Sequence, residues 1–261
     1  MLSKLLKNDL KKNMSWMWIL FVSTVAIALL SRGCKELAEN ITFFKILAIF
    51  FDSIFYALIV NTLLHPFLRG FLNFSKSLYG DESYLTHTLP VTKNQIINSK
   101  YLTSLIETLL GFITVVISLL IVFGSPTMFD TLKILLSLTI SGDFSIVLLL
   151  TLIVLLILVE FLMFLSIIFF SIILAYKSKE KRVLKTFLFT TAFAFASSTV
   201  LSIALVIVLL INNVSLTSAT LTLSANALFS IILTGIIIYL AITTLFYFLA
   251  KKEFNKGVNV D

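Results

Sequence analysis

The sequence predicts an all-α, polytopic membrane protein with six transmembrane helices. Of its 261 residues, 59% are hydrophobic and only 13% are charged, whereas a soluble domain carries about a quarter charged residues. A helix needs about 20 mainly apolar residues to cross the hydrocarbon layer of a bilayer. We expect one transmembrane domain over residues 1–261, with spans at roughly 14–31, 42–72, 101–123, 144–176, 186–211 and 226–249.

The composition also excludes several classes of protein. Cys34 is the only cysteine, so no internal disulfide can form, and two histidines are too few for a His-rich metal site. These counts exclude a secreted disulfide scaffold, a disordered chain and a soluble enzyme built on His and Cys. An intramembrane enzyme is disfavoured because the spans contain no paired aspartates, His-Glu metal motif or Ser-Lys arrangement.

The first thirteen residues, MLSKLLKNDLKKN, predict an amphipathic elbow helix. Its leucines share one broad face and its lysines lie opposite, which favours a helix along the inner leaflet before the first span. A signal peptide is the alternative, because a lysine-rich start precedes an apolar run and Cys34 follows. Ser31, Arg32 and Gly33 fit a cleavage site poorly. We therefore expect the segment to be retained.

Basic residues predict the orientation of the spans. With the amino terminus inside, sixteen of the 20 lysines and arginines fall in cytoplasmic segments, and only Arg32, Lys35, Lys45 and Lys133 fall outside. Both termini are then cytoplasmic. The net charge of +7 indicates attraction to anionic lipid head groups. No basic run alternates with aromatic residues, so no nucleic-acid partner is expected.

Two stretches, 42–72 and 144–176, exceed a minimal span by about ten residues. We expect both to continue past the membrane surface as ordinary helix. In the connection 124–143, the apolar run LKILLSLTI is too short to cross. It predicts a helix at the outer interface or a segment that dips into the membrane and returns.

The connection between the second and third spans has the clearest local signals. Gly80 can end the descending helix in a left-handed conformation. Asp81 can then cap a short transverse helix that ends near Thr88, before Pro90. Thr92-Lys93-Asn94-Gln95 fits a capping box, which predicts a new helix that runs into the third span.

This arrangement predicts a short cytoplasmic helix held on two stiff helical arms. Such an element can receive a push from a soluble motor protein, although a simple capped loop is the plainer interpretation. The connection 176–185 could make a smaller contact of the same kind, or only set the topology. The candidate coupling residues are Leu78, Tyr79, Asp81, Glu82, Tyr84, Leu85 and Thr86.

The stretch GDESYLTHTLPVTKNQIINSKYL, residues 80–102, resembles the corresponding region of ABC-2 type transporter permeases of Gram-positive bacteria. The lysine-rich start, six spans and internal termini resemble that family over the whole chain. The motif itself covers about 25 residues, and Ser83 stands where a glycine is expected before Tyr84.

The resemblance implies several partners in a bacterial cytoplasmic membrane. A separate ATP-binding subunit, in two copies, would receive the transverse helix and bind ATP and Mg. A second copy of this chain or a homologous permease would complete the path. The cargo would be hydrophobic or amphipathic, with exporters for peptides of the phenol-soluble modulin or lantibiotic type similar in size. This chain has no G-x-x-x-x-G-K-[ST] loop, so we expect no cofactor and no enzymatic activity in it.

Polar residues inside spans are functional candidates because they are costly there. His65 and Glu107 lie at matching depth on consecutive spans and could form an ion pair, or only lock two helices, while Pro66 predicts a kink. Glu160 has no obvious partner, and with Asp52 it could attract a cationic cargo or simply be buried. The complete set is Asp52, Asn61, His65, Glu107 and Glu160.

The leading function is therefore a transport subunit driven by a separate ATPase. A secondary transporter coupled to protons through Glu160 or Asp52 is the alternative. A passive membrane anchor remains a third possibility, for which Asp52 and Glu160 would be freely replaceable by leucine.

Overall fold

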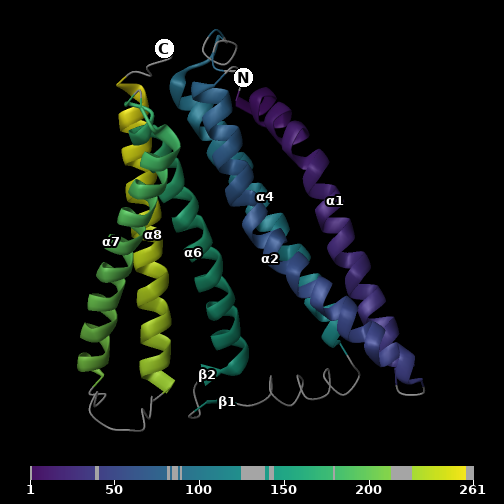
Figure 1. The fold of residues 1–261 in the computed structure, drawn as a ribbon. Coiled ribbons are helices and arrows are strands. Elements are labelled where there is room, and N and C mark those ends of the chain that lie inside the picture. The colour runs from purple at the N-terminus through teal and green to yellow at the C-terminus, as the bar shows by residue number, and fades with distance from the viewer. Residues whose placement is uncertain are drawn as a thin grey trace. The chain divides into compact units, whose positions relative to one another are not determined.

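The structure is a computed structural model that describes residues 2–38, 41–80, 83, 88, 90–124, 139–140, 144–178, 180–212 and 225–256. Six long helices account for nearly all of them (Figure 1). Each is long and apolar enough to cross a membrane, which confirms the six predicted spans. They are α1 (Leu2–Leu37), α2 (Thr42–Tyr79), α4 (Lys93–Phe123), α6 (Ile146–Ala175), α7 (Arg182–Ile211) and α8 (Ala225–Asn255).

Two short strands precede α6. β1 (Thr139–Ile140) pairs antiparallel with β2 (Phe144–Ser145), with Thr139 opposite Ser145 and Ile140 opposite Phe144. The last two residues of the run LKILLSLTI therefore form a strand, whereas the sequence predicted a helix at the outer interface or a segment that dips into the membrane and returns. The rest of that run lies outside the described residues.

The elbow expected at residues 1–13 is not a separate helix. α1 continues without a break from Leu2 to Leu37. The sequence supplies no proline or glycine before Gly33 to interrupt it. Asp9 and Asn13, moreover, bond to neighbouring helices. The first turns therefore pack within the bundle as part of α1.

α2 extends past its apolar span, as predicted from its length, and α4 begins at Lys93, ahead of its apolar span, as predicted from the capping box. α2 ends at Tyr79, and Gly80 follows with φ −100° and ψ −158°. This is an extended conformation, so the predicted left-handed end is wrong. Glycine is needed for space instead, because a Cβ atom at position 80 would lie 3.0 Å from the carbonyl oxygen of Lys76.

The predicted start of α4 is confirmed in detail. The Gln95 amide N–H donates to Thr92 Oγ1 at 3.4 Å, and the Thr92 N–H donates to Gln95 Oε1 at 3.2 Å. Both bonds of the capping box are thus present. Of residues 81–89, the structure describes only Ser83 and Thr88. The short transverse helix stays a prediction.

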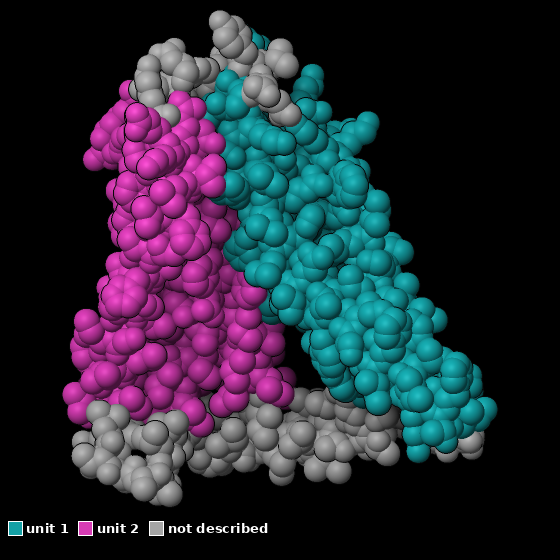
Figure 2. All heavy atoms as spheres, in the orientation of Figure 1, with its two compact units in different colours: residues 1–131 teal, residues 132–261 magenta. Residues whose placement is uncertain are grey.

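The chain packs as two compact units, residues 1–131 and 132–261, which Figure 2 colours separately. In unit 1, α1, α2 and α4 each pack against the other two, around a core that includes Ala28, Phe55 and Val122. In unit 2, α6, α7 and α8 do the same. Phe170, Phe193 and Phe246 join these three helices, with ring centroids 5.3–5.5 Å apart.

Polarity in unit 1 is distributed as a lipid environment requires. Hydroxyl side chains such as Thr24, Thr62 and Ser118 are buried between the helices, while large apolar side chains such as Ile46 and Ile49 are exposed. Lipid is as apolar as leucine, so close packing and internal hydrogen bonds hold such helices together. This pattern supports a multi-pass membrane protein.

At Gly111, α4 lies close to the backbone of α2. A Cβ atom at this position would lie 3.2 Å from the Thr62 carbonyl oxygen and 3.9 Å from both Phe21 and Pro66. The contact with Thr62 is to backbone, which cannot rotate away. The absence of a side chain at Gly111 therefore sets the spacing of these helices.

We expect Gly111→Leu to separate α4 from α2 and to lower the free energy of unfolding by about 2 kcal/mol. This corresponds to a fall of roughly 5 °C in the unfolding temperature, measured on the purified chain in detergent. Gly33→Leu is the matched control, because nothing lies within 4 Å of a Cβ there. Equal stability of the two variants would contradict the assignment.

Candidate functional site

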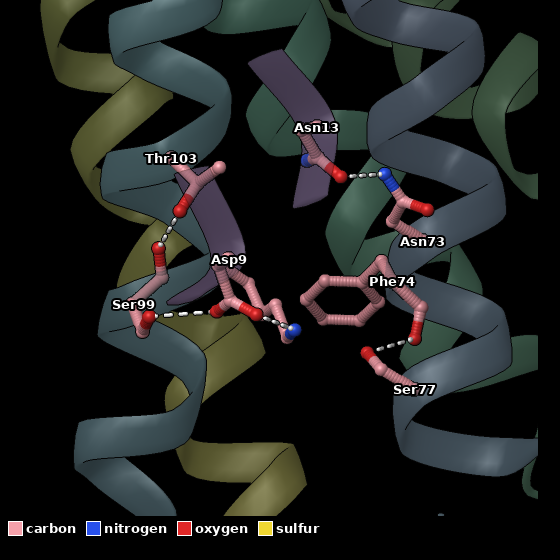
Figure 3. A network of polar contacts seen from close by, with 8 residues as sticks. Asp9, Asn13, Asn73, Phe74, Ser77, Ser99 and Thr103 are labelled. Carbon is pink, nitrogen blue, oxygen red and sulfur yellow. Dashed lines mark hydrogen bonds and ion pairs between the residues drawn. The ribbon is translucent and has the colours of Figure 1, made fainter. Parts of the chain in front are cut away.

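The candidate site is a chain of polar contacts along the three helices of unit 1. At one end, which we call the N-terminal end, the start of α1 meets the end of α2 and the start of α4 (Figure 1). Asp9 of α1 accepts hydrogen bonds from Ser99 Oγ at 2.8 Å and from Lys100 Nζ at 2.7 Å, both on α4 (Figure 3). The Asp9 and Lys100 side chains are largely buried.

A second contact at this end joins α1 to α2. Asn73 Nδ2 donates to Asn13 Oδ1 at 2.5 Å (Figure 3). On α4, Thr103 Oγ1 donates to the Ser99 carbonyl oxygen at 2.8 Å, which turns this hydroxyl back onto its own helix. α1 is therefore bonded to both helices that continue toward residues 80–92.

The opposite end of unit 1, where α1 turns into α2, has its own ion pair. Asp52 Oδ1 lies 2.9 Å from Lys35 Nζ and accepts a hydrogen bond from Ser31 Oγ at 2.5 Å. Arg32 Nη1 also donates to the Ile121 carbonyl oxygen of α4 at 3.2 Å. Asp52 is thus placed as a bond between two helices, which is the structural one of its two predicted roles.

The predicted ion pair between His65 and Glu107 is not formed. His65 Nε2 and both carboxylate oxygens of Glu107 are buried without a hydrogen bond of normal geometry to any described residue. Pro66, one residue later, is the side chain that faces α4, near Gly111. Successive residues of a helix point in directions about 100° apart. When Pro66 faces α4, His65 therefore points to a different side, although it lies at the same depth as Glu107. α2 stays one helix through Pro66.

The remaining two polar candidates are not among the residues that make these contacts. Asn61 is exposed on α2. Glu160 of α6, for which the sequence offered no partner, interacts with the Tyr239 hydroxyl of α8. Glu160 and Tyr239 both belong to unit 2, and this interaction is between two of its helices.

The candidate coupling residues are only partly described. Leu78 and Tyr79, at the end of α2, are buried. The expected exposure of Tyr79 as a contact for another protein is therefore not seen in this chain by itself. Asp81, Glu82, Tyr84, Leu85 and Thr86 lie outside the described residues, and their role stays a prediction.

Sequence reasoning missed Asp9, Asn13 and Asn73. Asp9 and Asn13 fall in the predicted membrane-surface helix, and Asn73 lies just outside the apolar stretch 42–72. One signal was available. Asp9 is the only acidic residue among four lysines in the first thirteen residues, and an acid in so basic a segment suggests a specific partner.

Comparison with known protein families, with curated proteins and with solved structures found no match to this chain.

A charge swap tests whether Asp52 bonds two helices or attracts cargo. Asp52→Lys should place two lysines together and lower the free energy of unfolding by about 1 kcal/mol. Adding Lys35→Asp should restore most of that loss, because the pair is re-formed with reversed charges. Thermal unfolding of the purified chain measures both. Glu36→Lys is the control, since Glu36 is exposed and pairs with Arg32 of its own helix. A double variant no more stable than Asp52→Lys would contradict this role.

Proposed function

We propose that this chain is the membrane subunit of an ATP-driven ABC exporter in the bacterial cytoplasmic membrane. Its cargo would be amphipathic peptides that leave through a path between two membrane subunits. The observation that carries the proposal is the pair of stiff arms at the N-terminal end of unit 1. α2 continues to Tyr79 and α4 begins at Lys93, so both helices run past their apolar spans toward residues 80–92.

The contacts of α1 make this end suited to transmit force. Asp9 bonds to α4 and Asn13 bonds to α2. A displacement of residues 80–92 would therefore move three helices together, where an unbonded loop would absorb the displacement. The capping box gives α4 a defined start close to the point where force would be applied.

In this mechanism the chain hydrolyses nothing itself. Two copies of a separate ATP-binding subunit bind ATP and Mg on the cytoplasmic side, where the proposed topology also places both termini. Closure of that dimer pushes the segment around Tyr84 and rotates α2 and α4. A second copy of this chain or a homologous permease provides the other half of the path.

The alternative of a proton-coupled carrier rested on Asp52 and Glu160. In the structure Asp52 pairs with Lys35, and Glu160 interacts with Tyr239. Neither residue is left without a partner, which favours a bonding role for both over a transport role. Export driven by a partner subunit also gives a role to the extensions of α2 and α4 beyond their apolar spans, which a proton-coupled carrier would not need.

Purification of the tagged chain from its native membranes tests the proposal. We expect mass spectrometry to recover an ATP-binding subunit, and the double variant Tyr84→Asp, Leu85→Asp to lose both that subunit and its coupled hydrolysis. Leu37→Asp with Ile41→Asp is the matched control, because these exposed apolar residues lie in the predicted outer connection. Full transport of a labelled amphipathic peptide by the chain alone in liposomes would overturn the proposal.

The stiffness of the α2 arm can be tested without removing the contact. Leu72→Gly with Lys76→Gly changes two exposed residues and weakens the helix by about 1 kcal/mol per glycine. We expect the ATP-binding subunit to remain bound and to hydrolyse ATP, while export of the labelled peptide into inverted vesicles falls. Leu72→Ala with Lys76→Ala should retain export. Unchanged export by the glycine variant would show that the arm transmits no force.

A further inference from the structure

Glu107 is an exception among the charged side chains of unit 1. It lies on α4, is 0% exposed, and neither of its carboxylate oxygens has a hydrogen bond of normal geometry to a described residue. By contrast, Asp9 accepts two hydrogen bonds and Asp52 has an ion pair and a hydrogen bond. The same three helices thus satisfy two acidic side chains and leave a third one enclosed.

The charged groups that face Glu107 do not supply a partner. They are Asp9 of α1, Arg69 of α2 and Lys100 of α4. Asp9 and Lys100 pair with each other at 2.7 Å. The Arg69 guanidinium lies over the Trp16 ring, 5.7 Å from its centroid. Each cation therefore already has another partner.

Asn13 is a further polar neighbour of Glu107. Its side-chain oxygen accepts the bond from Asn73, so its NH₂ group is the part that can face the carboxyl. One neutral amide is a weak donor for a full negative charge. An ionised carboxylate removed from water costs several kcal/mol unless it is paired and hydrogen-bonded.

The packing of the described residues encloses Glu107. Glu107 has no exposed surface. One turn further along α4, Gly111 brings the backbones of α4 and α2 into close approach. A proton is small enough to bind within such packing, and it removes the charge that nothing else neutralises.

We propose that the Glu107 carboxyl is a proton-binding site that keeps its proton while the three helices of unit 1 are packed together. Separation of α4 from α1 and α2 admits water, and the carboxylic acid then releases its proton to that water as the carboxylate forms. Re-packing takes up one proton from solvent. This links the packing of unit 1 to pH, and it requires neither an ATP-binding partner nor transport of the proton across the membrane.

Infrared spectroscopy of the purified full chain tests the proposal directly. A protonated carboxylic acid has a C=O stretching band that a carboxylate lacks, and this band shifts in D₂O. At pH 7 we expect the wild type to show this band and Glu107→Gln to lose one carboxyl's share of it. Glu107→Gln has the shape of the neutral acid, so it should fold. Glu36→Gln, at an exposed position, should leave the band unchanged, and Glu160→Gln identifies any share from the other glutamate inside a span.

Thermal unfolding provides a second measurement. The wild type should lose stability as the pH rises, because ionisation of Glu107 places a charge within the packed helices. The glutamine in Glu107→Gln cannot ionise. The unfolding temperature of this variant should therefore change less with pH than that of the wild type, and the difference is the contribution of the Glu107 carboxyl group. Identical infrared spectra of the wild type and Glu107→Gln in the carboxylic acid region at pH 7 would overturn the proposal. So would the same pH dependence of unfolding in both proteins.

Discussion

The interior of a bilayer offers no hydrogen bonds, and the rest of this structure depends on that constraint. Each polar group has to find its partner within the chain. Backbone groups do so by forming six long helices. Many hydroxyl side chains do so by bonding back to their own helix, as Thr103 and Thr108 bond to carbonyls four residues earlier. Asp9 and Asp52 are instead paired between helices, and those pairs join α1 to α4 and to α2.

In unit 1 these pairs lie at the two ends, and the middle is held by close approach. Asp9 joins α1 to α4 at the N-terminal end, and Asp52 joins α1 to α2 at the other. Between them, the hydroxyls of Thr24 and Thr62 lie 3.0 Å apart, and Gly111 lets α4 approach the backbone of α2. Small side chains and hydroxyls thus bring the helices together where apolar attraction cannot. Glu107 lies in this tightly packed part, so a negative charge on its carboxyl group would be enclosed by the packed helices.

The same contacts couple the first turns of α1 to α2 and α4. An amphipathic segment lying on the membrane surface would move independently of α2 and α4. As part of α1 it bonds to both, so it behaves as a third member of the arms that flank residues 80–92. The proposed coupling to a motor protein therefore involves the first thirteen residues as well as the connection between α2 and α4.

The sequence by itself determined the features that depend on near neighbours along the chain: the number of spans, the end of α2 before Gly80 and the capping box from Thr92 to Gln95. Span length and helix capping depend on residues that are close together in the sequence, so both can be predicted from the sequence of one protein. Tertiary structure alone decided which side chains meet. The expected pairing of His65 with Glu107 failed because depth is readable from sequence, but the rotation of each helix about its axis is not. That rotation is set by packing of whole helix faces.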